Sequence, residues 1–529
     1  MAVSSPILGI AVAAYMIVVF YLGWLGYKQT KNTDDYMLAG RKVNPFVLAF
    51  SYGAAFISTS AIIGFGGYAG AFGMGILWLV VMNIFVGIFI AFVVFGSRTR
   101  RIGVNLKAVT FPELIGRRFQ SRFIQGFSGA LITIFMPLYA GSVLIGGARF
   151  METALDINYN VAVLILAIIV AAYVITGGLI AVMYTDALQG VLMFIGMGIL
   201  LVLTYSKLGG VIEAHQALTN MAYLVPDNLA AVGHNGWTSM PALGSPTWWT
   251  LVSTIILGVG IGVLAQPQLA VRFMTVKNTR SLKRAVLSGG PFIFMMAGVA
   301  YIVGALSNVY FFDTKGMLSI DVAGGNIDKI MPEYINSAMP DYFVVFFLLT
   351  LLAAAMSTLS SQFHAMGTAF GHDFYREFVM KGKIGKTITL TRVGIATTIM
   401  ASVVLAYILP PGIIARATAI FFGLCAAAFL PMYSGAIFWK RMTKEGAIAS
   451  LLVGTFSSLF WLTFVHVKEA SALGISQALF GKVTLLTGTW TVIDPILVAT
   501  PLSIIVAIVV SLMTKPASKE HIDLCFKRE

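Results

Sequence analysis

The sequence has very little charge for its length. Only 11% of its 529 residues are Asp, Glu, Lys or Arg, whereas 58% are hydrophobic and the mean hydropathy is +0.89. A water-soluble fold of this size would need far more charged surface. Apolar stretches of 18 or more residues recur along the chain, and each is long enough to cross a bilayer as a helix. The sequence therefore predicts an all-α, polytopic protein of the lipid bilayer.

The sequence also lacks the motifs of catalysis and metal binding. It contains no H-E-x-x-H, no Walker sequence and no nucleophile–base constellation, and its six His residues have no metal-ligand spacing. Cys425 falls in a predicted span and Cys525 in the inner tail, so no disulfide is expected. No Lys or Arg precedes Lys28, so the first apolar segment is interpreted as a retained span. These absences argue against an enzyme and favour movement of a solute.

About thirteen spans are predicted, and the basic residues orient them. The spans are residues 6–27, 46–71, 74–97, 123–150, 159–176, 180–206, 248–271, 285–308, 341–370, 389–409, 412–439, 446–466 and 491–513. With the N-terminus outside, 27 of the 35 Lys and Arg residues fall on the inner side and 5 in the opposite loops. The positive-inside rule then predicts an outer N-terminus and a cytoplasmic tail of residues 516–529. The net charge of +14 thus reflects orientation in the cell membrane and not a nucleic-acid partner.

One predicted span carries hydroxyl groups where hydrocarbon is expected. The run "AAAMSTLSSQ" directly follows "FVVFFLLTLL". On a helix, Ala354, Ser357 and Thr358 share a face, so the Ala354 carbonyl and the two hydroxyls could converge on one point. Hard cations prefer oxygen ligands, and a shell without a carboxylate suits a monovalent cation. The alternative is that these hydroxyls hold helices together through hydrogen bonds.

Two predicted spans, five spans apart, contain residues that interrupt helices. Span 46–71 carries Gly53 among small residues, and span 248–271 carries three glycines and Pro267. Paired interrupted spans are typical of inverted-repeat transporters, in which unwound backbone offers carbonyls to a cation and N–H groups to an anionic substrate. Glycine also lets helices approach closely, so packing is the alternative explanation.

Several motifs resemble the sodium:solute symporter family. They are "ITGGLIAVMYTDALQGVLMFIGM" (Ile175–Met197), "AAAMSTLSSQ" and "LYAGSVLIGGARFMETA", while "LAQPQLAVRFM" is similar to the proline and pantothenate branches. The resemblance covers residues 10–515 approximately and implies one transmembrane domain, 1–515, with a LeuT-type fold. Its two inverted five-helix repeats are expected at about 46–206 and 248–439. The implied function is sodium-coupled import of a small organic solute by alternating access; a sensor of the same fold, or a channel, is the alternative.

The resemblance implies a sodium site between the first and eighth core helices. Its ligands would be the backbone carbonyls of Ala54 and Ile57, the Ala354 carbonyl, and the hydroxyls of Ser357 and Thr358. The positions on the eighth core helix keep the residue types that the family uses. The hydroxyls are therefore expected to replace part of the ion's water shell.

A second sodium, which only some members of the family bind, would lie near Asp186, Ser360 and Ser361. Asp186 has another interpretation. It could cap its helix, with Gln189 three residues later reaching back as in a capping box.

The resemblance and the helix breaks also suggest substrate contacts. Tyr139 matches a substrate-facing aromatic position of the proline branch, and the other candidates are Ser58, Val259, Val263 and Gln266. The proline branch has aromatic residues at the two valine positions and an Asp where this chain has Phe56. The expected pocket is small and apolar, with no buried cation to pair a substrate charge. It suits a monocarboxylate, a pantothenate-like acid or an apolar amino acid, whose carboxylate could rest on N–H groups of a broken helix.

Three further features have less specific interpretations. In "AVTFPELIGRRF", Thr110 and Glu113 have capping-box spacing, which predicts a short inner helix. His364 is expected to pack or hydrogen-bond within the bundle and not to bind a metal. Arg149 could pair a substrate carboxylate, or it could extend to the outer surface.

Overall fold

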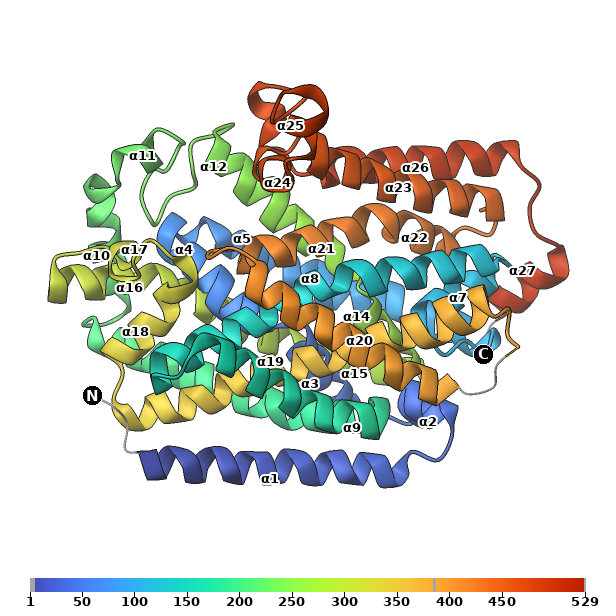
Figure 1. Ribbon diagram of the computed structural model, residues 1–529, viewed down its shortest axis with the longest axis horizontal. Coiled ribbons are helices and arrows are strands. Elements are labelled where there is room, and N and C mark those ends of the chain that lie inside the picture. Colours follow the sequence, from blue (N-terminus) through green and yellow to red (C-terminus); the bar gives the residue numbers. More distant parts are fainter. Residues whose placement is uncertain (1–4, 384–386, 528–529) are drawn as a thin grey trace.

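The fold is a bundle of long helices. The structure is a computed structural model that describes residues 5–383 and 387–527. Within these ranges ten helices are long and apolar enough to cross a membrane, and two further pairs of bent helices raise the number to twelve. Figure 1 shows most of them running along the long axis of the molecule, with the short helices and loops at its two ends. The predicted polytopic all-α class is confirmed.

The thirteenth predicted span comes from one helix that reverses. Helix α9 (Tyr159–Lys207) has 49 residues, which at 1.5 Å per residue is about 73 Å, more than twice the hydrocarbon thickness of a bilayer. Its regular path breaks at Gly178, where φ is 61° and ψ is −161°. A Cβ there would lie 2.6 Å from the ring of Tyr36, so backbone and space both require glycine. The two halves of α9 are therefore two spans.

The spans fall into two consecutive sets of five, and each set opens with a broken span. The first set comprises α3 (Pro45–Phe56) with η2 (Ser60–Phe65) and α4 (Gly66–Phe72), then η3 to α6 (Met74–Asn105), α8 (Arg122–Leu155) and the two halves of α9. The second set comprises α12 to η7 (Pro246–Ala265) with α14 (Pro267–Ala270) and η8 (Val271–Met274), α15 to α16 (Thr279–Lys315), α19 (Asp341–Thr368) with η11 (Ala369–Val379), α20 (Thr387–Ile408), and α21 (Ile414–Ala428) with α22 (Leu430–Phe438). Helix α1 (Ser5–Gln29) precedes them, and α23 (Lys444–Phe464) and α26 (Ile496–Met513) follow.

The first break lies beyond the glycine that suggested it. The axis turns by 53° between α3 and η2, and the backbone leaves the helix at Ile57, where φ is −90° and ψ is 105°. Gly53 stays helical, and a Cβ there would lie 2.5 Å from the ring of Phe292. It therefore serves close packing. The second break falls at Gln266, with φ −68° and ψ 117°, as expected for a residue before Pro267.

Most of the short connecting helices gather at the two ends of the molecule. At the left of Figure 1 lie α10 (Val211–Asn220), α11 (Asp227–Ala230), α17 (Ser319–Val322) and α18 (Ile330–Ala338); at the right lie α2 (Thr33–Leu38), α7 (Phe111–Arg118) and α27 (Lys519–Phe526). Helix α7 begins as predicted, because the Thr110 hydroxyl accepts the Glu113 N–H at 3.1 Å. The Glu113 carboxylate reaches back to the N–H of Val109, at 2.7 Å. We refer to the right-hand end as the basic end.

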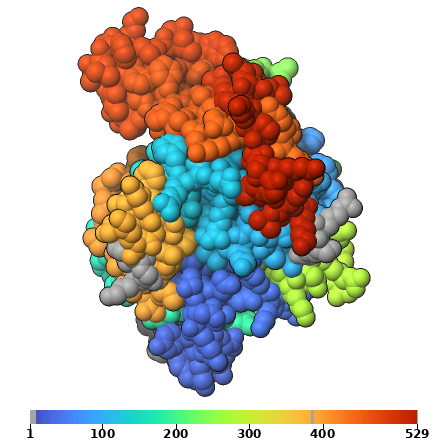
Figure 2. All heavy atoms as spheres, turned by 90° about the vertical axis from the view of Figure 1, so that its right-hand side faces the viewer, coloured from blue at the N-terminus to red at the C-terminus, as the bar shows by residue number. Residues whose placement is uncertain are grey.

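The C-terminal segment folds back onto the basic end. Figure 2 faces this end and shows the red C-terminal residues lying against the cyan segment that contains α7 and the start of α8. The amide of Asn105 donates to the carbonyl of Cys525 at 3.2 Å, and the guanidinium of Arg118 lies 5.3 Å from the centre of the Phe526 ring. Cys425 and Cys525 are both buried, free cysteines. The predicted tail is thus a docked helix.

Candidate functional site

The first break faces the hydroxyl groups of α19. Ser357 Oγ and Thr358 Oγ1 both donate to the carbonyl oxygen of Ala54, at 2.9 and 3.1 Å. Ser357 Oγ also lies 3.3 Å from the carbonyl oxygen of Ala354. All four residues are fully buried. Four of the five predicted sodium ligands therefore lie together, although Ala54 and Ser357 are 303 positions apart in the chain.

The break explains why a backbone oxygen is available at this point. In a continuous helix the carbonyl of Ala54 would accept the N–H of Ser58, but the helix ends at Phe56. Ile57, the fifth predicted ligand, is the buried residue at which the backbone turns away. A hydroxyl can donate to a carbonyl or turn its lone pairs toward a cation. The same atoms can therefore join α3 to α19 and form part of a shell for a dehydrated monovalent ion.

The three residues of the predicted second ion site also come together, around a buried carboxylate. Ser360 Oγ lies 3.0 Å from Asp186 Oδ1, and Ser361 Oγ lies 3.1 Å from Oδ2. Two groups that sequence reasoning missed join them. Ser51 donates to Oδ2 at 3.2 Å, and the guanidinium Nη2 of Arg272 lies 2.7 Å from the same oxygen. We call these five residues the Asp186 cluster.

Arg272 corrects two expectations. It was assigned to an inner loop, and no buried cation was expected, but its side chain is 0% exposed. Besides Asp186 it donates to the Gln268 carbonyl at 2.6 Å and lies 2.5 Å from Ser361 Oγ. Hydropathy along the chain gave no sign of this position, because Arg272 follows directly on the broken span and η8 carries it into the bundle. Its charge is already matched by that of Asp186.

The capping interpretation of Asp186 is wrong. Asp186 lies eight residues beyond the break at Gly178, inside the second helical half of α9, whereas an N-cap stands at the first turn. The Gln189 side chain does not reach back to it either, because its Nε2 donates to the hydroxyl of Tyr15 at 3.0 Å. Asp186 thus serves tertiary contacts with Ser51, Arg272 and α19.

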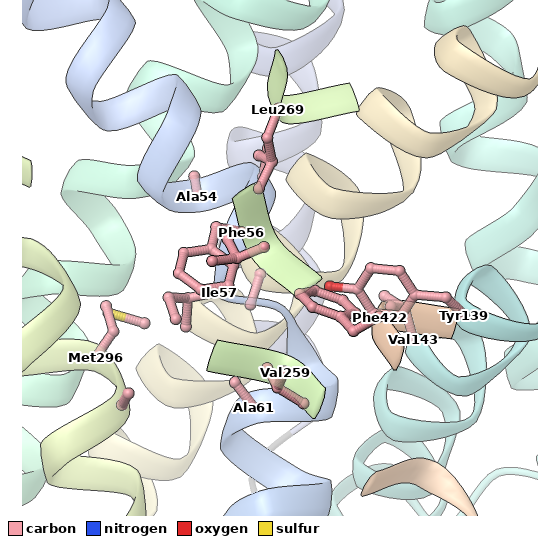
Figure 3. Close-up of a cluster of buried hydrophobic side chains, with 14 of the residues drawn as sticks. Ala54, Phe56, Ile57, Ala61, Tyr139, Val143, Val259, Leu269, Met296 and Phe422 are labelled. Atoms are coloured by element: carbon pink, nitrogen blue, oxygen red, sulfur yellow. The ribbon is translucent and has the colours of Figure 1, made fainter. Parts of the chain in front are cut away.

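The substrate candidates line the two breaks. Ser58, Tyr139, Val259, Val263 and Gln266 are each at most 3% exposed, so this conformation closes them off from solvent. Figure 3 shows the buried cluster around them: Phe56, Ile57 and Val259 come from the broken spans, and Tyr139 and Phe422 face them from α8 and α21. The ring of Tyr139 stands at 76° to that of Phe422, with centres 5.2 Å apart. Its hydroxyl points toward the broken spans.

One polar group in this apolar region stands out. Gln266 sits at the second break with its side chain fully buried. Its Oε1 accepts the amide of Gln268 at 3.1 Å, whereas its Nε2 has no nitrogen or oxygen partner within the described part of the chain and only the thiol of Cys425 nearby. A buried donor left without a partner costs about 1–3 kcal/mol. A carboxylate or carbonyl oxygen of a solute would accept a hydrogen bond from this amide.

Two residues with open interpretations lie apart from these sites. Arg149 Nη1 is 2.8 Å from Glu152 Oε2, and its guanidinium covers the ring of Tyr159 at 4.1 Å. It is thus paired near the C-terminal end of α8, and the interpretation as a substrate ligand gains no support. His364 packs at 5.6 Å from the ring of Tyr36, as expected, and its ring nitrogens have no hydrogen-bond partner among the described residues.

The fold and its two broken spans place this protein among the membrane transporters of the LeuT type, which are built from two sets of five spans. The family model "Sodium:solute symporter family" matches residues 36–454, most of the chain. The chain belongs to the sodium:solute symporter family. It is therefore a multi-pass, sodium-coupled symporter of a small molecule and not an enzyme.

Relatives and solved structures agree with this assignment. The osmoregulated proline transporter OpuE of Bacillus subtilis (strain 168) is 27% identical over 513 residues, which are 96% of this chain and 95% of the relative. The sodium/proline symporter of Escherichia coli (strain K12) is 27% identical over 473 residues, 88% of this chain and 89% of the relative. Among structures, a substrate-bound, outward-open Na+-coupled sialic acid symporter superposes with a TM-score of 0.75 at 18% identity, covering 97% of this chain and 98% of that one. At this identity the match establishes the fold.

Proposed function

We propose that this protein imports a small, largely apolar solute that carries a carboxylate, together with sodium bound between α3 and α19. The solute classes are apolar amino acids, monocarboxylates and pantothenate-like acids. The observation that carries the proposal is the convergence of the Ser357 and Thr358 hydroxyls on the freed carbonyl of Ala54. With the carbonyls of Ile57 and Ala354, these groups form the proposed sodium shell.

The first break supplies a physical basis for coupling. Ala54 and Ile57 would offer backbone oxygens to the ion, while Phe56, the last residue of α3, and Ser58, just beyond the break, are buried candidates for the substrate side. A cation that binds the two carbonyls therefore holds the segment that shapes the substrate site. The solute then binds a preorganised pocket, and this is the condition for positive coupling between two ligands.

The proposed substrate site suits at most one negative charge. Tyr139 and Gln266 supply a hydroxyl and an unpartnered amide, and Val259 and Val263 supply apolar walls. Arg272 is engaged by Asp186, so a solute carboxylate would depend on these dipoles and on the nearby sodium. Proline is the first solute to test, because the relatives OpuE and the Escherichia coli symporter are proline transporters.

We also propose Asp186, Ser360 and Ser361 as a second, conditional sodium site. In this conformation Arg272 donates to Asp186 and Ser361, the acceptors that an ion would use. A second sodium therefore requires the guanidinium to move away.

The proposed arrangement in the cell membrane has the repeats at 46–206 and 248–439, an outer N-terminus and a cytoplasmic C-terminus.

The test is uptake into liposomes that contain the purified protein. We expect proline, pantothenate or lactate to accumulate when an inward sodium gradient is imposed, and accumulation to stop when potassium or choline replaces sodium at constant voltage. One charge crossing 100 mV releases about 2.3 kcal/mol, which sustains about a 50-fold gradient of a neutral solute. A monoanion carried with one sodium would gain nothing from voltage. Uptake that does not depend on sodium contradicts the proposal. A sodium current that flows without any transported solute indicates a channel.

A further inference from the structure

A large hollow opens at the basic end, and its lining shares no residue with the two ion sites. It has a volume of about 770 Å³ and lies where the end of α1, the 28–44 connection, the start of α3 and the second half of α9 meet. In Figure 1 this is the region around α2, at the right-hand end of α1. Its lining includes Lys28, Lys31, Lys42, Asp35, Val47 and Tyr184. We call it the lysine hollow.

The rim of the lysine hollow is positively charged. Lys28, Lys31 and Lys42 are all exposed, and none forms an ion pair within the described residues. The single carboxylate of the rim, Asp35, already accepts the backbone N–H of Lys31 at 3.1 Å. Three unpaired ammonium groups around one concavity attract a phosphate-sized anion, and the attraction persists near a membrane surface.

The inner wall of the hollow is apolar and continues toward the lipid-facing surface. Val47 and Met183 line this wall together with Tyr184, which is 41% exposed. On the neighbouring helix, Trp24 is 52% exposed and lies 5.3 Å beneath the ammonium group of Lys28. Aromatic residues of this kind concentrate where hydrocarbon meets headgroups. A cationic rim above an apolar wall matches a ligand with an anionic head and acyl chains.

We propose that the lysine hollow binds the headgroup of an anionic phospholipid of the inner leaflet, with its acyl chains along α1 and α9. The apolar wall favours a lipid over a free phosphate ion, which would use the lysines alone. Such a lipid would bridge α1 to α9, which already pack so closely that a Cβ on Gly26 would lie 2.5 Å from the backbone of Ala181. The inference depends on the predicted orientation but on neither the substrate nor the ion sites.

The test is thermal unfolding of the full chain in detergent, without sodium or solute. We expect phosphatidylglycerol to raise the unfolding midpoint, and phosphatidylcholine with the same chains to leave it unchanged. The triple variant Lys28→Gln, Lys31→Gln, Lys42→Gln should need at least tenfold more phosphatidylglycerol for a half-maximal shift. The Lys→Arg triple at the same positions should behave as wild type. Because transport is not measured, a failed symport hypothesis leaves this result unaffected.

A matched control removes the same charge elsewhere. Lys277→Gln, Lys283→Gln, Lys381→Gln changes three exposed lysines that do not line the hollow, and it should keep the wild-type response. Equal loss in this control would reduce the effect to net charge and overturn the proposal. So would an equal shift with phosphatidylcholine. If glycerol phosphate or inorganic phosphate reproduced the shift, the hollow would be a free-phosphate site and the lipid proposal would be wrong.

Discussion

The two polar clusters on α19 use the same hydroxyl chemistry but balance charge in opposite ways. Ser357 and Thr358 meet a backbone carbonyl, and every group in that cluster is neutral. Ser360 and Ser361, one turn further on, meet the full charge of Asp186, which Arg272 neutralises from within the protein. The neutral cluster contains no cation of its own, so it is the one suited to take a cation from solution.

The difference also separates their expected roles in stability. Deleting one hydroxyl from the neutral cluster removes one hydrogen bond, and such bonds contribute about 0.5–1.5 kcal/mol each. Removing one partner of a buried ion pair leaves an uncompensated charge, which costs about 3–5 kcal/mol. The first cluster can therefore be altered with modest effects on folding. In the second, loss of either Asp186 or Arg272 alone should destabilise the fold strongly.

The largest effect is expected for Arg272→Met. This change leaves Asp186 buried and charged without its counterion, so stability should fall by about 3–5 kcal/mol in potassium or choline. If the Asp186 cluster can also hold sodium, then sodium should restore much of the loss, because the ion takes the place of the guanidinium. Thermal unfolding in matched sodium and choline salts measures this. In the double variant Arg272→Met, Asp186→Asn the sodium effect should fall back to what the proposed site between α3 and α19 contributes alone.

Charge counting adds an independent check on the same cluster. In liposomes with wild-type protein, the ratio of charge to solute, after correction for the solute's own charge, gives the number of sodium ions. A ratio that corresponds to one sodium, together with no sodium rescue of Arg272→Met, would reject the second ion site and leave Asp186 with a purely structural role. Two sodium ions per solute, with rescue, would support it.

The next effect concerns the neutral cluster. Ser357→Ala and Thr358→Ala each remove one ligand from a small shell, so the sodium concentration for half-maximal uptake should rise about tenfold or more, equivalent to at least about 1.4 kcal/mol. The protein should remain folded. Thr350→Ala is the matched control, because among the described residues its hydroxyl, on the same helix, bonds only the carbonyl of Phe346, at 3.2 Å. Wild-type sodium dependence in both variants would mean that the hydroxyls only join helices.

A comparable but solute-specific effect is expected for Gln266→Leu. This change removes the unpartnered amide at the second break, and a hydrogen bond to a charged group is worth about 1.5–3 kcal/mol. The KM for a carboxylate solute should rise about tenfold, with a smaller change for its uncharged amide analogue. Uptake assays with both solutes make the comparison. A KM that rises equally for both would assign Gln266 to packing at the break.

The smallest effect concerns another buried carboxylate, at the end of the molecule opposite the basic end. Asp328, in η10 (Ile327–Lys329), accepts the backbone N–H of Gly412 at 2.8 Å. Burial raises the pKa of Asp328 from 3.8 to about 7, although hydrogen bonds from the backbone at residues 412–414 act to lower it. When the segment around Asp328 is docked on residues 412–414, it binds a proton more readily than when that contact is open and solvated. Docking of this segment should therefore weaken as pH rises from about 4 to 7.

The Asp328→Asn variant tests that sign. Its amide oxygen can still accept the N–H of Gly412, but it carries no charge, so the pH dependence of docking should disappear in this window. Hydrogen exchange across α17 and α18 at pH 5 and pH 8 reports the docking. If the wild type exchanges faster at pH 5 than at pH 8, after correction for intrinsic rates, the inferred direction is wrong.

Much of the fold could be predicted because hydrocarbon imposes long apolar runs on the chain. The reversal at Gly178 was predicted as a gap between two spans, and the broken spans were predicted from glycine and proline content. The position of the first break was not, since Gly53 packs against Phe292 and the backbone turns only at Ile57. A glycine in a predicted span can mark either a helix break or a close contact between helices, and the packing of neighbouring side chains decides which of the two occurs.

The sites were less accessible from the residues alone. The spacing of Ser357 and Thr358 on one helical face indicated a cation site. The contact with Ala54 spans 303 positions in the chain, and it was predicted only from the family resemblance. Arg272 was missed because an arginine beside a predicted span looks like a loop residue until its buried partner is known. Asp186 had two interpretations because the helix start could not be located to within one turn.

The docking of α27 bears on how the protein is handled in the laboratory. A purification tag or reporter joined after this helix would emerge beside Asn105 and Arg118 and not from a free tail. Cutting the chain after residue 515 would remove the Phe526 ring from the Arg118 guanidinium and open a cleft at the basic end. Detergent extraction and labelling are therefore best compared between proteins tagged at either terminus before any difference in transport is assigned to the ion sites.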